Sequence, residues 1–140
     1  MVRLLVLEDD DELRALYRRL LGPRYGVWLW SSREASRLWQ LLAQGYRVPE
    51  VGGFALIISS PWLEINPDEP CSERLIRALR REFPEVPVIL AGRSPTAPIW
   101  VRLLTEVDAR VHGLFPVTEH ALADLVDRLL GATVSSEGGI

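Results

Sequence analysis

The sequence of 140 residues contains no lysine, so all sixteen of its strongly basic side chains are arginines. Any functional site that requires a lysine ammonium group is therefore excluded, whatever fold the chain adopts. Nineteen acidic residues outweigh the arginines and give a formal net charge of −3. This balance argues against nucleic acid as a partner, because nucleic-acid-binding surfaces usually carry a clustered basic patch.

Cysteine and long apolar runs are also scarce. Cys71 is the only cysteine, which excludes an internal disulfide and is typical of a reducing compartment. No apolar run approaches the roughly 20 residues needed to span a membrane. The apolar run at the N-terminus ends in acidic residues, unlike a secretory signal. We therefore expect a cytoplasmic protein without a membrane partner.

Short apolar runs alternate with helical patterns along the chain. The runs that predict strands lie at 2–7, 27–30, 54–59, 88–91 and 111–115. Each is short and mostly apolar, which is typical of a sheet covered on both faces. Strands alternating with helices predict βα repeats joined by right-handed crossovers. The expected fold is α/β, a flavodoxin-like (βα)5 doubly wound parallel five-stranded sheet with strand order 2-1-3-4-5.

Local signals indicate where helices begin and where the domain ends. Ser31 and Glu34 form a capping-box pattern at the start of the second predicted helix. Thr118 is placed to cap the fifth. The sequence after this helix is small and polar. We therefore expect one domain over 1–131 and a flexible tail over 132–140.

Four segments, taken in their order and spacing, carry a family resemblance. They are LLVLEDDDELRALYRRLL at 4–21, FALIISS at 54–60, REFPEVPVILAG at 81–92 and FPVTEHALADLVDRLL at 115–130. Together they resemble the receiver domain of bacterial response regulators, over nearly the whole chain. The resemblance implies a role in two-component signal transduction or a phosphorelay.

Receiver domains build their phosphorylation site at the carboxyl ends of the strands. Two acids after the first strand position Mg²⁺, and an aspartate after the third strand accepts the phosphoryl group. A Thr or Ser after the fourth strand and a Lys after the fifth bind its oxygens. The resemblance places these positions at Glu8 and Asp9, at Ser60 (or Ser59 if the register slips by one), at Gly92 and at Phe115. Only the acid pair is retained, and the lysine is replaced by an aromatic ring.

These replacements predict that the phosphoryl chemistry is lost. A serine hydroxyl needs a general base and an electrostatic clamp before it can accept a phosphoryl group, whereas an aspartate is already ionised at pH 7. Phe115 stands in place of the clamp, and Pro61 and Trp62 add to an apolar rim that disfavours phosphate. We therefore expect no catalytic residue and no enzyme activity.

Two interpretations of the acidic run at 8–11 stay open. In the first, Glu8 and Asp9 bind Mg²⁺ weakly, as a vestige of the receiver site. The binding is weak because the acceptor aspartate, one of the ligands, is lost, and because Mg²⁺ exchanges its bound waters for protein ligands only reluctantly. In the second, the acids only cap helices, because carboxylates at a helix N-terminus accept backbone N–H bonds and suit the helix dipole. No other cofactor is expected.

Trp62, Trp100 and His112 are the candidates for an interaction surface. Exposed tryptophans are enriched at interaction hot spots, although Trp100 also fits core packing. His112 falls where many receivers carry a mobile Tyr or Phe. Receivers commonly signal through the fourth helix, fifth strand and fifth helix, so the resemblance implies protein partners, or a homodimer, at that surface.

The resulting hypothesis is an atypical receiver, or pseudo-receiver, that acts by protein–protein interaction without aspartyl phosphorylation. One alternative is a receiver that is still phosphorylated at a non-standard residue with Mg²⁺. Another is the regulatory fragment of a longer output protein. Ser60, Gly92 and Phe115 favour the first hypothesis over the second.

Overall fold

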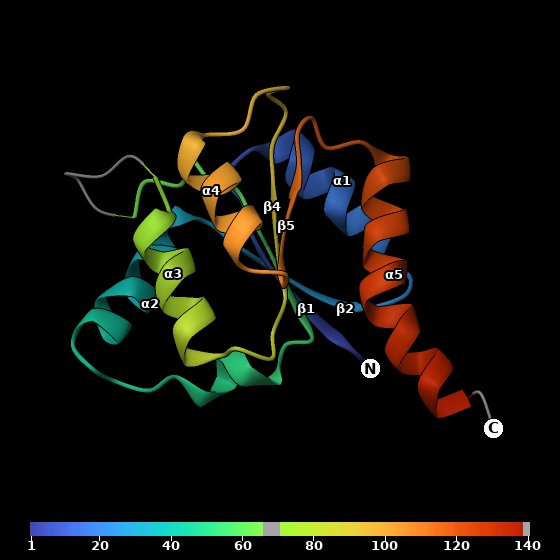
Figure 1. The fold of residues 1–140 in the computed structure, drawn as a ribbon, viewed down its shortest axis with the longest axis horizontal. Helices are drawn as coiled ribbons and strands as arrows, with labels where there is room; N and C mark the ends of the chain where they lie inside the picture. Colours follow the sequence, from blue (N-terminus) through green and yellow to red (C-terminus); the bar gives the residue numbers. More distant parts are fainter. Residues whose placement is uncertain (66–70, 139–140) are drawn as a thin grey trace.

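A parallel β-sheet lies between two layers of helices (Figure 1). The computed structural model describes residues 1–65 and 71–138. Within these residues the strands are β1 (Arg3–Leu7), β2 (Gly26–Trp30), β3 (Leu56–Ser59), β4 (Val88–Ala91) and β5 (Val111–Leu114). They pair in parallel in the order β2-β1-β3-β4-β5. This order confirms the predicted flavodoxin-like topology.

The helices divide between the two faces of the sheet. They are α1 (Asp11–Leu21), α2 (Ser32–Ala43), α3 (Glu73–Glu82), α4 (Ile99–Val107) and α5 (Glu119–Gly138). Helices α1 and α5 cover one face, and α2, α3 and α4 cover the other (Figure 1). Because strand side chains alternate, Leu4 and Val6 pack towards α1 and α5, whereas Leu5 and Leu7 pack towards α2, α3 and α4. This two-sided burial explains the continuous apolar runs in the sequence.

Two helix starts follow the predicted capping. The Ser31 hydroxyl accepts from the N–H of Arg33 at 3.3 Å, and the Glu34 carboxylate accepts from the N–H of Ser31 at 3.1 Å. The Thr118 hydroxyl accepts from the N–H of Ala121 at 3.2 Å. These bonds satisfy backbone donors that have no partner within the helix.

Some element boundaries differ from those expected. A short 3-10 helix, η1 (Pro49–Gly53), precedes β3, and β3 begins at Leu56. Phe54 instead packs edge-on against Trp28 and Trp30, with ring centroids 5.6 and 6.4 Å apart. The Phe54 N–H donates to the carbonyl of Val51 at 3.1 Å, so residue 54 closes η1 and lies outside the sheet.

The C-terminal helix is longer than expected. Helix α5 continues to Gly138, past the predicted domain end at 131, and the flexibility of the tail over 132–140 stays a prediction. Residues 66–70 of the long loop after β3 lie outside the described residues. None of the described helices is long enough and apolar enough to cross a membrane.

Arg80 joins the end of α3 to the turn before β5. Its Nε donates to Asp108 Oδ2 at 2.8 Å, and its Nη1 donates to the carbonyls of Val86 at 2.7 Å and Phe83 at 3.3 Å. The Arg80 side chain is largely buried. Its guanidinium holds the pKa of the Asp108 carboxyl below its ordinary value. Truncating Arg80 would leave several acceptors without their donor.

We predict that Arg80→Ala lowers the free energy of unfolding by about 3 kcal/mol, because breaking a largely buried ion pair leaves its partner uncompensated. Arg81 is the matched control, since its side chain is 74% exposed and, among residues 1–65 and 71–138, its one ion pair is to Glu82 at 3.9 Å. Arg81→Ala should change stability by about 0.5 kcal/mol or less. Urea denaturation followed by circular dichroism measures both, and equal losses would contradict the role given to Arg80.

Candidate functional site

The carboxyl ends of β1, β3 and β4 meet at a shallow hollow of about 280 Å³. The residues that line it include Glu8, Asp9 and Asp10 after β1, Ser60 and Trp62 after β3, and Gly92 and Arg93 after β4. The fold thus brings together most of the positions to which the sequence assigned a degenerate phosphorylation site. Phe115, after β5, joins them through its contact with Trp62.

The three acids after β1 accept hydrogen bonds from the backbone. Glu8 Oε1 accepts from the N–H groups of Asp9 at 3.1 Å and Asp10 at 3.0 Å. Asp9 Oδ1 accepts from the N–H of Ser32 at 2.7 Å, at the start of α2. Asp10 Oδ1 accepts from the N–H of Leu13 at 3.0 Å and caps α1. The acidic run therefore holds two helix starts in place.

Arg93 adds a positive charge that the sequence interpretation missed. Its guanidinium lies 2.6 Å from Asp10 Oδ1 and 2.9 Å from Glu12 Oε2. The hydrogen bond from Arg93, followed by that from the Leu13 N–H, holds the pKa of Asp10 below its ordinary value. The available signal was an arginine two residues after β4, since the parallel strands of one sheet all end at the same edge.

Glu8 is the one acid of the corner that is buried, with 5% of its surface exposed. Burial raises its pKa from 4.5 to about 7, against the opposing effect of the N–H bonds from Asp10 and Asp9. Within the described residues its Oε2 has no hydrogen-bond partner, and neither does the buried hydroxyl of Tyr17. Burial, followed by the charge of Glu8, also raises the pKa of Tyr17.

The raised pKa of Glu8 predicts a pH-dependent stability. The folded protein binds a proton on Glu8 more tightly than the unfolded chain does. The resulting contribution of Glu8 to the free energy of unfolding is therefore full below pH 4.5 and is lost as pH rises through 7. Between pH 5 and 8 we expect the free energy of unfolding to fall by on the order of 2 kcal/mol through Glu8.

Glu8→Gln should remove most of that fall, because glutamine does not ionise. Asp9→Asn, at an exposed neighbouring position, is the control and should leave the fall in place. Urea denaturation of the three proteins at pH 5 and pH 8 tests this. An unchanged pH dependence in Glu8→Gln would show that Glu8 ionises normally.

The acid corner fits a resident Mg²⁺ poorly. Mg²⁺ prefers octahedral oxygen coordination, but Glu8 Oε1 and Asp10 Oδ1 are engaged in hydrogen bonds, and Arg93 already lies against Asp10. In residues 1–65 and 71–138, no three His, Cys, Asp or Glu side chains are placed to hold a metal ion. The weak Mg²⁺ site at Glu8 and Asp9 stays a prediction.

Ser60 is buried and stabilises the turn after β3. Its hydroxyl oxygen accepts from the N–H of Trp62 at 3.2 Å. Its carbonyl accepts from the hydroxyls of Ser72 at 2.8 Å and Ser59 at 2.9 Å. The sequence interpretation missed Ser72, which is fully buried and whose N–H donates to the carbonyl of Pro61, just after β3, at 3.1 Å. Both candidate acceptor serines are therefore buried groups engaged in local hydrogen bonds.

The indole ring of Trp62 packs directly over Gly92. A Cβ atom added at Gly92 would overlap the ring, with Cη2 at 3.1 Å and Cε3 at 3.3 Å among its nearest atoms. Trp62 also meets Phe115 edge-on, with centroids 6.0 Å apart and planes at 88°. Trp62 as a whole residue remains 43% exposed. A side chain at position 92 would therefore require the Trp62 ring to shift.

This contact predicts a coupled pair. Gly92→Thr should lower the free energy of unfolding by about 1–3 kcal/mol, because the new side chain displaces the Trp62 ring. In a Trp62→Ala background the same substitution should cost much less. Gly131→Ala is the control, since an added Cβ there would meet nothing within 4 Å among the described residues, its chain neighbours and its own helix backbone aside. Additive losses in the double variant, measured by thermal unfolding, would contradict the contact.

Trp100 and His112 lie on opposite faces of the sheet. Trp100 is half-buried against the core beneath α2, α3 and α4. His112 lies half-buried beside α5. Burial, followed by the charge of Arg128, lowers the pKa of His112. The three predicted interaction residues, Trp62 included, do not form one continuous patch.

Solved structures share the fold of this chain, whereas no protein-family model and no curated protein matches it. The BeF3-activated receiver domain of DrrB has a TM-score of 0.65 at 18% identity, covering 94% of this chain and 98% of that one. The chemotaxis protein CheY4 of Vibrio cholerae has a TM-score of 0.61 at 19% identity, covering 92% and 98%. A Burkholderia pseudomallei protein described as pilus assembly-related has a TM-score of 0.63 at 22% identity, covering 92% and 89%. The chain has the fold of response-regulator receiver domains.

Proposed function

We propose that the chain is a pseudo-receiver, a receiver-fold module that signals through protein contacts and is not phosphorylated. The observation that carries this proposal is the packing of Trp62 against Gly92 and Phe115. By resemblance, positions 92 and 115 would bind the oxygens of the phosphoryl group. The indole ring occupies the space between them, so a phosphoryl group would have to displace it.

The charges of the site support the same function. A phosphorylated receiver needs a divalent cation and a lysine to balance the phosphoryl oxygens. This chain has no lysine, and the guanidinium of Arg93 pairs with Asp10 and Glu12. The acid corner is thus partly neutralised by the chain itself. Phe115 contributes no charge where the lysine would stand.

The burial of the serines also supports the absence of phosphoryl transfer. Ser60 is 7% exposed, and its hydroxyl oxygen accepts a bond from the Trp62 N–H. An attacking hydroxyl must be reached by the donor and must lose its proton to a base. Phosphorylation of Ser60 would therefore require both the turn and the tryptophan to move.

An apolar stripe on α4 supports a protein partner. Ile99, Leu103 and Val107 are spaced by four residues and are all exposed, whereas Val101 and Leu104 of the same helix are buried. Residues at this spacing share one face of a helix, and exposed apolar patches mark interaction sites. Contact with a signalling partner through α4, β5 and α5 follows, a homodimer being one such arrangement.

Intact-mass spectrometry after incubation with acetyl phosphate and Mg²⁺ tests the proposal. We expect the mass to stay that of the unmodified chain. A receiver domain with a complete site, run in the same mixture, shows that the donor is active. A stoichiometric phosphoryl adduct would contradict the proposal. If the adduct were mapped to Ser60 or Ser59, the chain would be a receiver with a non-standard phosphoacceptor.

A further inference from the structure

Strand β5 is an edge strand whose outer side is open. The carbonyls of Arg110 and Leu114 accept from the N–H groups of Val88 at 2.9 Å and Gly92 at 3.3 Å. Backbone groups along a strand point alternately to its two sides, so those of Gly113 point away from β4. Within the described residues, Gly113 takes part in no backbone hydrogen bond outside the sheet ladder.

Gly113 leaves this edge without a protecting side chain. The residue is exposed, and a glycine within a strand often marks a place where another backbone approaches closely. An added Cβ would meet Phe115 at 3.4 Å and Thr105 at 4.0 Å, which is ordinary contact. Close packing against the chain itself therefore does not require a glycine here, unlike at Gly92.

Two hollows lie on either side of the β5 edge. One, of about 420 Å³, is lined from the α4 side by residues that include Arg102, Thr105 and Phe115. The other, of about 480 Å³, is lined from the α5 side by residues that include His112 and Arg128. Gly113 and Thr105 line both, so the hollows meet across the strand edge. An added strand would place alternate side chains in the two hollows.

The other edge of the sheet is less open. The outward-facing carbonyl of Leu29 on β2 accepts from the Arg14 guanidinium at 3.5 Å, and the large side chains of Trp28 and Trp30 flank that strand. Covering an edge is one of the usual means by which sheets avoid pairing with another chain. Of the two edges, β5 is therefore the better template.

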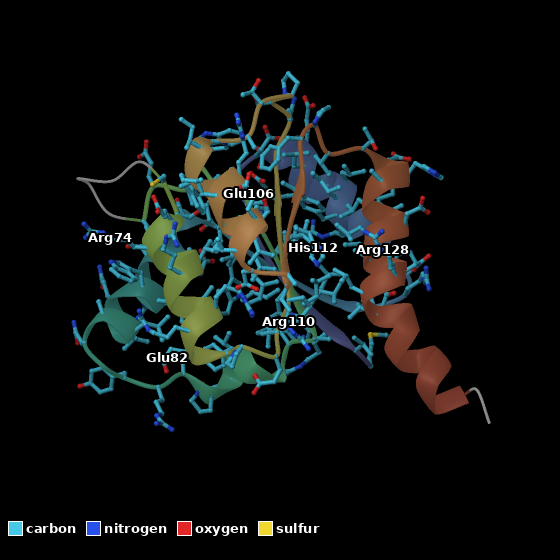
Figure 2. The ribbon with its side chains drawn as sticks, viewed as in Figure 1. Arg74, Glu82, Glu106, Arg110, His112 and Arg128 are labelled. Carbon is cyan, nitrogen blue, oxygen red and sulfur yellow. The ribbon has the colours of Figure 1, made fainter. Side chains whose placement is uncertain are left out.

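Charge indicates what kind of strand would bind. Arg102 and Arg128 face the two hollows, and Arg128 reaches from α5 towards β5 and His112 (Figure 2). In the part of the chain that the structure describes, neither arginine forms an ion pair. The one acid among the lining residues, Asp124, lies 3.1 Å from His120. A carboxylate on each face of an added strand would complement this edge.

We propose that β5 binds an extended acidic segment of a partner protein, which adds to the sheet as a sixth strand. Helices α4 and α5 flank β5 on its two sides (Figure 1), so a single extended segment fits the edge better than a second folded copy does. Backbone bonds to Gly113 supply affinity, and Arg102 and Arg128 select carboxylates. The proposal rests on the function proposed above and names the partner's chemistry.

Fluorescence anisotropy tests this with a labelled synthetic peptide rich in valine and threonine that carries one glutamate on each face of the strand. We expect saturable binding, and no binding of the counterpart with lysine for glutamate. The double variant Arg102→Glu, Arg128→Glu should weaken binding roughly tenfold. Its control, Arg18→Glu with Arg37→Glu, makes the same charge change at exposed positions on α1 and α2 and should bind normally.

Backbone methylation separates strand addition from simple charge attraction. Two further peptides carry N-methyl groups, the first on the odd-numbered residues and the second on the even-numbered residues. Each peptide can then no longer donate backbone hydrogen bonds from one edge of the added strand. One should lose binding and the other should keep it. If both bind as well as the parent peptide, or if the arginine variant binds normally, the proposal is overturned.

The two proposals fail separately. Absence of peptide binding together with an unmodified mass removes only the strand addition. A phosphoryl adduct removes the pseudo-receiver proposal whatever the peptide does.

Discussion

The packing of Trp62 over Gly92 is the contact on which the carboxyl edge of the sheet depends. It joins the turn after β3 to the end of β4, and the edge-on contact with Phe115 extends it to the end of β5. The three residues depend on one another. A side chain at position 92 would displace the Trp62 indole, and the aromatic ring of Phe115 gives the indole an apolar neighbour. The three positions are best understood as one replacement of a phosphoryl pocket by an aromatic contact.

The acid corner beside this contact serves a different purpose. Asp9 and Asp10 hold the starts of α2 and α1, and Arg93 crosses from β4 to pair with Asp10. These bonds link three loops at the same edge of the sheet. Glu8 remains buried with one oxygen unpartnered, a destabilising arrangement at neutral pH that a structural role alone does not explain.

The strands, their order and the helix caps could be predicted from the sequence, because buried apolar runs and capping patterns are local signals. The gathering of Ser60, Gly92 and Phe115 followed from topology, since parallel strands end at one edge. Topology also places Arg93 at that edge, but it does not predict the pairing of Arg93 with Asp10 and Glu12. Ser72 could not be predicted at all, because its partner is far away in the sequence and serine is common on surfaces. The half-buried position of Trp100 was equally undetermined, because an apolar residue near a helix start fits either core or surface.

Nuclear magnetic resonance of the Trp62 indole N–H, assigned with Trp62→Phe, tests the central claim most directly. The measurement looks for nuclear Overhauser effects that connect the Trp62 ring protons with the Hα protons of Gly92 and with the ring protons of Phe115. If the indole packs over Gly92 and meets Phe115 edge-on, both sets of effects should be observed. Absence of both would show that the ring lies away from the pocket and would contradict the account.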